Sequence, residues 1–135
     1  MRYLIDTATL SNSLTMPGVL PARIVALMAE EEPKGLCAVS LLELAVHFRH
    51  GRLRVVNLAD FFTLALADNI ELLDLTPAVA VATNDLPRNF PGDPFDRTIA
   101  ATARVLGLTL ITPDPKIRDA RFCDVEFYPF RLSRA

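Results

Sequence analysis

Short apolar segments of strand length alternate with helical segments along the whole chain. The apolar segments fall at 2–6, 36–39, 70–75, 108–112 and 125–128, and apolar residues recur at helical spacing between them. Because most of these segments are continuously apolar, they are typical of strands buried on both faces of a parallel sheet. Parallel neighbours need crossover connections, which the helices supply. The pattern therefore predicts an α/β fold with a mostly parallel central sheet covered by helices on both faces.

Capping residues mark where the predicted helices begin and end. Asp93 precedes Pro94 as an N-cap precedes a first-turn proline, and Gly107 stands at the C-terminal cap position. The helix between them is predicted to bury Phe95, Ile99, Ala103 and Leu106. A helix from Ser40 is predicted to bury Leu41, Leu44, Ala45 and Phe48, and another amphipathic helix is predicted over 58–68.

The length and composition bound the kind of protein. A chain of 135 residues with 51% hydrophobic and 22% charged residues is expected to form one globular domain, 1–135. No apolar run approaches the roughly 20 residues of a membrane span, and an acid at position 6 interrupts any signal-peptide core, so we expect a cytoplasmic protein. The net charge of −2 argues against a non-specific nucleic-acid coat, but it does not exclude a nuclease.

Carboxylates follow the predicted strands at the edge where such sheets bind ligands. Asp6 ends the first strand, Glu43 lies one helical turn after the second, and Asp114 comes two residues after Thr112, the end of the fourth. Ligands of parallel α/β sheets bind beyond the carboxyl ends of the strands. These three acids, far apart in the sequence, are therefore predicted to meet at one edge of the sheet.

Asp96 is expected to join them from the helix that begins at Pro94. It shares one helical stripe with Ile99, Ala100 and Ala103, so it heads an inward-facing apolar row. A carboxylate in that place needs a hydrogen-bond partner, a capping role or a metal.

Each acid also has a purely structural interpretation. Asp6 is a candidate N-cap, Asp93 and Asp96 are spaced as a capping pair, and Asp114 between two prolines suits a turn. Glu43 three residues after Ser40 matches a capping box. Their coincidence at one sheet edge favours a functional cluster.

Converging carboxylates repel one another unless protons or cations relieve the charge. Oxygen ligands without cysteine or paired histidine ligands favour Mg²⁺ or Mn²⁺, which activate water and stabilise charge on a phosphoryl group. Thr7 and Thr112 adjoin two of the acids and are candidates to orient water or phosphate. Arg97 is the leading candidate for RNA binding, while His47 and His50 are interpreted as solvated or RNA-facing.

The chain resembles PIN-domain proteins, specifically the VapC-type toxins of toxin–antitoxin pairs. The matching segments are YLIDT at 3–7, CAVSLLELAVHFRHGRL at 37–53 and GDPFDRTIAATARVLGLTLITPD at 92–114. This resemblance implies a three-layer α/β/α sandwich with an acidic Mg²⁺ or Mn²⁺ site. It also implies a metal-dependent endoribonuclease that acts on RNA, often tRNA or rRNA, forms a homodimer and is inhibited by a cognate antitoxin protein.

The resemblance places the family acids on Asp6, Glu43, Asp96 and Asp114 as metal-binding and catalytic residues, and Asp93 as an accessory residue. It implies that Asp6 and Asp96 contact the metal, while Glu43 and Asp114 position water or a second ion. Three positions depart from the family pattern: Ala8 replaces a frequent His, Leu42 a frequent Trp and Pro113 a frequent Arg. None of the three removes a metal ligand.

Two other functions fit parts of the sequence. A non-catalytic PIN module that binds RNA or a protein partner would share the fold, and metal binding would separate it from a nuclease. A phosphatase of the haloacid-dehalogenase kind would use Asp6 as nucleophile, but that chemistry needs a second Asp where this chain has Ala8.

Overall fold

The sheet has five strands, all parallel, in the order β3-β2-β1-β4-β5. The structure, a computed structural model, describes residues 1–66 and 69–131. Its strands are β1 (Tyr3–Ile5), β2 (Lys34–Cys37), β3 (Ile70–Leu73), β4 (Thr109–Thr112) and β5 (Val125–Phe127). The predicted parallel sheet is confirmed, and β5 is an edge strand as the sequence indicated.

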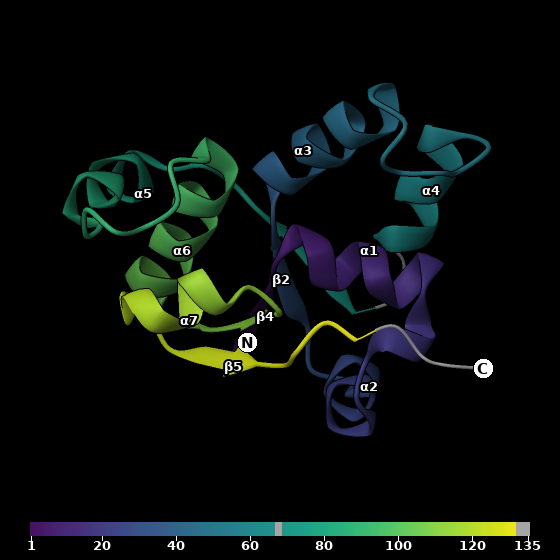
Figure 1. The fold of residues 1–135 in the computed structure, drawn as a ribbon, viewed down its shortest axis with the longest axis horizontal. Helices are drawn as coiled ribbons and strands as arrows, with labels where there is room; N and C mark the ends of the chain where they lie inside the picture. The colour runs from purple at the N-terminus through teal and green to yellow at the C-terminus, as the bar shows by residue number, and fades with distance from the viewer. Residues whose placement is uncertain (67–68, 132–135) are drawn as a thin grey trace.

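Helices cover both faces of this sheet (Figure 1). The α-helices are α1 (Thr7–Thr15), α2 (Ala22–Ala29), α3 (Ala38–Arg49), α4 (Leu58–Ala65), α5 (Pro77–Ala82), α6 (Pro94–Leu106) and α7 (Pro115–Ala120). Two 3₁₀ turns, η1 (Pro17–Val19) and η2 (Thr83–Asp85), complete the described elements. The last residues of the helix predicted over 58–68, at 67–68, lie outside the described residues.

Successive strand residues point into two separate hydrophobic cores. Leu4 and Leu110 belong to the core beneath α5, α6 and α7. Ile5 and Ile111, one residue further along the same strands, belong to the core beneath α1, α2, α3 and α4. Because neighbouring side chains of a strand point to opposite faces, only a sheet covered on both sides makes such segments apolar throughout. The predicted three-layer α/β/α arrangement is confirmed.

Some local predictions were wrong. The second strand ends at Cys37 rather than at 39, and α3 begins at Ala38. An apolar run has the same appearance in a buried strand and in a buried helical turn, so the pattern did not show at which residue the strand ends and the helix begins. Phe48 and Leu106, predicted to be buried, are 37% and 52% exposed because each lies at the end of its helix, beyond the sheet.

Candidate functional site

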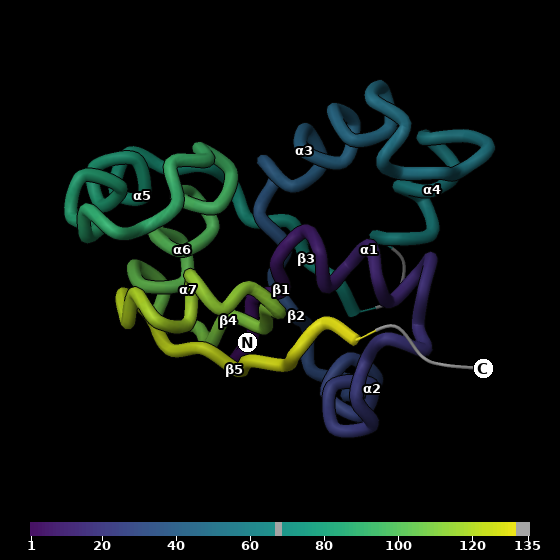
Figure 2. Tube along the Cα trace, in the orientation of Figure 1, coloured from purple at the N-terminus to yellow at the C-terminus, as the bar shows by residue number. Residues whose placement is uncertain are grey.

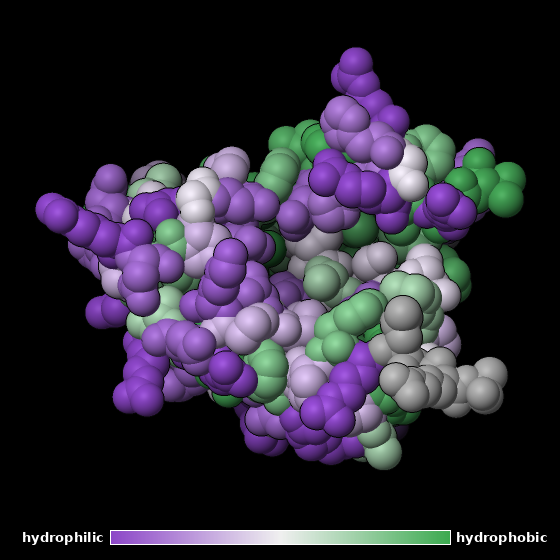
Figure 3. Space-filling model, in the orientation of Figure 1, coloured by the Kyte–Doolittle hydropathy of each residue, from purple (hydrophilic) through white to green (hydrophobic). Residues whose placement is uncertain are grey.

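A cavity of about 510 Å³ opens at the carboxyl ends of β1 and β4, between α1, α3 and α6. The space-filling view shows this face hollowed in its middle (Figure 3). All four acids predicted as metal-binding residues line the cavity: Asp6, Glu43, Asp96 and Asp114. The structure therefore brings together side chains that lie far apart in the sequence. The largest separation, 108 residues, is between Asp6 and Asp114.

Asp6 is held rigidly between β1 and β4. Its side chain caps α1 by accepting a hydrogen bond from the backbone N–H of Thr9, 2.7 Å from Oδ1, and the hydroxyl of Thr112 donates to Oδ2. The residue is only 5% exposed, and burial raises the pKa of its carboxyl to about 6 against these hydrogen bonds. The capping role is thus confirmed and coexists with a place in the acid cluster.

Asp96 lies in the first turn of α6, three residues after the N-cap Asp93. The stripe predicted beneath it is buried, with Ile99, Ala100 and Ala103 at most 1% exposed. The pKa of Asp96 is raised to about 7, first by burial and then by the negative charges of the other acids: Asp93, Glu43, Asp6 and Asp114. All four of the other acids thus lie close enough to Asp96 to raise its pKa.

Glu43 does not form the predicted capping box. Helix α3 begins at Ala38 after Cys37, so Ser40 is inside the helix, where its hydroxyl accepts a hydrogen bond from Thr7 Oγ1 at 2.9 Å. Glu43 is 7% exposed, and burial raises the pKa of its carboxyl. Its Oε1 is buried and meets no hydrogen-bond partner within residues 1–66 and 69–131. Such an atom is costly unless a ligand satisfies it.

Asp93 and Asp114 each cap a helix with one oxygen. The Oδ1 of Asp93 accepts from the backbone N–H of Phe95 at 2.7 Å, and the Oδ1 of Asp114 accepts from that of Lys116 at 2.9 Å. A carboxylate has two oxygens with about four acceptor positions, so a cap leaves it free to accept elsewhere. The interpretation of Asp93 as a cap was correct, whereas Asp114, interpreted as a turn residue, is the N-cap of α7; neither cap competes with a role in the site.

The residues fit a hard divalent cation. Glu43, Asp93 and Asp96 each offer a carboxylate oxygen, and these three atoms lie within 4.8 Å of one another. Glu43 is also the residue whose buried Oε1 meets no partner among the described residues. This arrangement differs from the prediction, which treated Asp93 as accessory. The predicted ligands Asp6 and Asp114 line the same cavity but stand outside this closest set.

The two threonines predicted as accessory residues are engaged inside the protein. Thr7 donates to Ser40, and Thr112 donates to Asp6 while accepting from the backbone N–H of Asp114 at 3.1 Å. They orient the acids and the helices that carry them.

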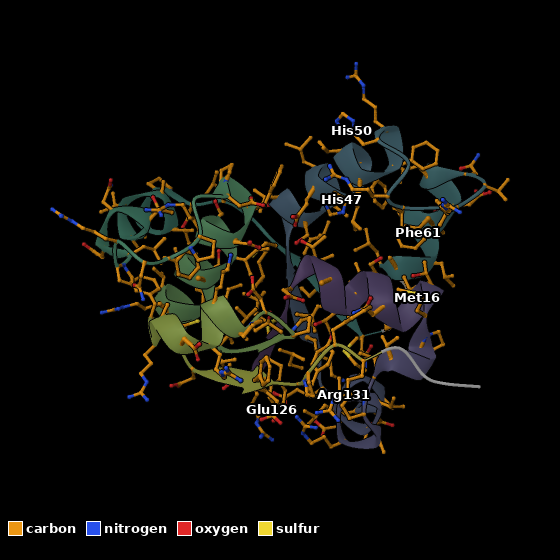
Figure 4. The ribbon with its side chains drawn as sticks, viewed as in Figure 1. Met16, His47, His50, Phe61, Glu126 and Arg131 are labelled. Carbon is orange, nitrogen blue, oxygen red and sulfur yellow. The ribbon has the colours of Figure 1, made fainter. Side chains whose placement is uncertain are left out.

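The positive charge in the cavity comes from a residue that sequence reasoning did not single out. Arg52 lines the cavity, whereas Arg97, the predicted RNA contact, does not and donates to the carbonyl of Thr83 at 3.4 Å. His47 also lines it, 3.9 Å from Glu43 Oε2, and Figure 4 shows it on the α3 side of the hollow. Arg52 follows the end of α3, and only the return of the chain after that helix brings it to the site.

Of the three departures from the expected family pattern, two lie in the cavity wall. Ala8 and Pro113 line the cavity, together with the partly exposed apolar side chains of Met16 and Phe130. Leu42 is 60% exposed and does not line it. Nothing in the sequence around Met16 or Phe130 indicates that they line a common cavity, because the two residues lie far apart in the chain.

Comparison with known proteins identifies what this chain is similar to. A family model described as "PIN domain" matches residues 3–122. Ribonuclease VapC22 of Mycobacterium tuberculosis is 36% identical over 86 residues, which are 64% of this chain and 66% of that relative. The match thus spans slightly less than two thirds of the relative's length.

Two solved structures show the same fold. One is VapBC2 from Rickettsia felis bound to a DNA fragment from their promoter, with a TM-score of 0.71, 17% identity, and 94% of this chain and 98% of that chain covered. The other is VapC20 of Mycobacterium tuberculosis, described as a Sarcin-Ricin loop cleaving toxin, with a TM-score of 0.66, 16% identity, and 91% and 98% covered. Among the described residues, no helix is long and apolar enough to cross a membrane.

Proposed function

The chain belongs to the PIN-domain family, and we propose that it is a divalent-metal-dependent endoribonuclease, the toxin of a VapBC-type toxin–antitoxin pair. The observation that carries this proposal is the acid-lined cavity, in which Glu43 has a buried, unpartnered Oε1 and lies close to Asp96. The names of the relatives support the activity, since one is called a ribonuclease and another a loop-cleaving toxin. The substrate is RNA, with tRNA or rRNA the leading candidates, and the whole chain acts as one domain.

The partners follow from the same relatives. One of the matching solved structures is described as a toxin–antitoxin complex, and we infer that a cognate antitoxin binds and inhibits this chain. A homodimer is proposed as the toxin's own assembly.

Glu43, Asp93 and Asp96 would hold the cation, with Asp6 and Asp114 beside them. When bound, a Mg²⁺ or Mn²⁺ ion generates a nucleophile from water at neutral pH and neutralises the charge that develops on the phosphoryl oxygens. The protein's own contribution is placement, because hydrogen bonds from caps and buried partners orient the carboxylates of Asp6, Asp93 and Asp114 before substrate arrives. Asp114 also lines the cavity and would orient the water, and the guanidinium of Arg52 would bind a phosphate oxygen.

Metal dependence provides the direct test. The purified chain should cleave RNA internally in the presence of Mg²⁺ or Mn²⁺, and EDTA should stop cleavage because the acids alone cannot activate water at neutral pH. Cleavage products are resolved on a denaturing gel, and added Mn²⁺ should restore them after EDTA treatment. Undiminished cleavage in EDTA would contradict the mechanism. Tight Mn²⁺ binding without cleavage of any RNA would instead support a non-catalytic module.

Arg52 is predicted to contribute more to RNA binding than Arg97. Arg52→Ala should raise the KM for RNA by about 10-fold, since an interaction between an ionised donor and phosphate contributes roughly 1.5–3 kcal/mol. Arg97→Ala is the matched control, because it removes the same side chain from beside the site but not from the cavity lining. Steady-state kinetics at fixed salt measures both variants. A larger increase of KM for Arg97→Ala would return the assignment to the residue predicted from the sequence.

A further inference from the structure

Tyr128 is fully buried, directly after β5, and lies beyond the residues 3–122 matched by the family model. Its backbone N–H donates to the carbonyl of Thr112 at 3.2 Å. Its hydroxyl lies 3.0 Å from Thr9 Oγ1 and 3.4 Å from Asn12 Nδ2. Tyr128 thus connects β4 to α1 near the site. Figure 2 shows the chain continuing from β5 toward the side of the molecule where α1 lies.

The direction of the hydrogen bonds around Tyr128 follows from counting protons. The Thr9 hydroxyl has one proton and donates it to the carbonyl of Ile111 at 3.0 Å. Thr9 can therefore only accept from Tyr128, so the tyrosine hydroxyl donates to Thr9 and accepts from the amide of Asn12. The result is a directed chain from Asn12 through Tyr128 and Thr9 to the backbone of β4.

Tyr128 contacts two residues, Thr9 and Thr112, that bind Asp6. Each of them donates to a different oxygen of the Asp6 carboxylate. The backbone N–H of Thr9 donates to Oδ1, and the hydroxyl of Thr112 donates to Oδ2. A shift of α1 relative to β4 would separate these two donors and rotate the carboxylate. Tyr128 binds the side chain of the first donor and the backbone of the second, so it bridges them, in addition to the direct bond from Thr9 to Ile111.

We propose that Tyr128 is a positioning residue of the metal site, which fixes the orientation of the Asp6 carboxylate through Thr9 and Thr112. This inference rests on the proposed function, because it requires Asp6 to belong to the metal site. Its physical basis is that partners behind a ligand orient it, and their loss typically reduces metal affinity by about 10–100-fold.

The test is Tyr128→Phe, which removes only the hydroxyl. Calorimetric titration with MnCl₂ should show an affinity about 10-fold weaker than that of the unchanged protein, at a temperature where circular dichroism shows both to be folded. The KM for RNA should stay unchanged, because Tyr128 does not line the cavity. Tyr3→Phe is the matched control: it is the chain's other tyrosine, it is also buried, and its hydroxyl accepts from Arg2. This control should leave Mn²⁺ affinity unchanged.

A purely structural role would lower the melting temperature of Tyr128→Phe but leave Mn²⁺ affinity at the original value, and that result would overturn the proposal. If Tyr128→Phe does not fold, Thr9→Val removes the same contact from its other end together with the bond from Thr9 to Ile111, and it should weaken Mn²⁺ binding at least as much. An unchanged affinity in Thr9→Val would equally overturn the proposal.

Asp6→Asn separates this proposal from the proposed function. If Asp6→Asn weakens Mn²⁺ binding, Tyr128→Phe in that background should cause no further loss, because both changes act through one carboxylate. An additional 10-fold loss there would contradict the route through Asp6. If Asp6→Asn alone leaves both Mn²⁺ affinity and cleavage intact, Asp6 does not belong to the metal site and the proposal for Tyr128 fails, while the proposed function, which places the cation on Glu43, Asp93 and Asp96, stands.

Discussion

Asp96→Asn should abolish RNA cleavage and weaken Mn²⁺ binding by at least about 100-fold while the protein stays folded. Loss of a partner behind a ligand already reduces metal affinity by about 10–100-fold, so loss of a ligand itself should exceed that range. The amide is nearly isosteric with the carboxyl, and Asp93 rather than Asp96 caps α6, so the helix keeps its start. Gel-based cleavage assays and calorimetric titration with MnCl₂ measure the two effects.

Asp74→Asn is the matched control for this experiment. Asp74 is an exposed aspartate one residue past the end of β3, at the same end of the sheet, but it does not line the cavity. It should retain full cleavage and Mn²⁺ affinity. Asp93→Asn tests whether Asp93 is a metal ligand or the accessory residue predicted from the sequence. A loss of Mn²⁺ affinity comparable to that of Asp96→Asn would make Asp93 a ligand. A small loss would support the accessory role. Normal cleavage by Asp96→Asn would exclude the proposed site.

The metal-free protein should become less stable as the pH rises from 4 to 8, and Mn²⁺ should reverse this loss. The pKa values of Asp6 and Asp96 are raised in the folded protein, to about 6 and about 7 from 3.8. Between pH 3.8 and 7 the folded protein therefore keeps protons that the unfolded chain releases, so stability falls as pH rises and the loss is complete above pH 7. The loss is about 3 kcal/mol from Asp6 and about 1–2 kcal/mol from the partly solvated Asp96.

Urea unfolding in EDTA at pH 5 and pH 8 measures this dependence. Asp96→Asn should flatten the profile and be more stable than the unchanged protein at pH 8 without metal, because it removes one of the repelling charges. Asp74→Asn should follow the original profile. Saturating Mn²⁺ should raise stability most at pH 8, where the carboxylates are ionised and can bind it. A metal-free stability that increases steadily from pH 4 to pH 7 would contradict the assigned burial of these acids.

The periodic features of the chain made most of the fold and part of the site predictable. Uninterrupted apolar strands require cover on both faces, so the parallel three-layer architecture followed from hydrophobic pattern alone. Asp96 was identified because a helix repeats every three to four residues, which places it above Ile99 and Ala103, and both are buried. Capping by Asp93 was equally local, since a cap acts on the next two or three residues.

The sequence by itself determined which acids meet, because parallel strands bring their carboxyl ends to one edge of the sheet whatever the details of packing. The tertiary structure decided how they are arranged. It placed the Ser40 hydroxyl against Thr7 inside α3, so Glu43 does not form the capping box that the local pattern also allowed. It also decided that Arg52 rather than Arg97 lines the cavity, and that Tyr128 holds Thr9 beside Asp6. The physical reason is range: periodicity and capping act over a few residues, whereas these contacts join segments that only the packed sheet and helices bring together.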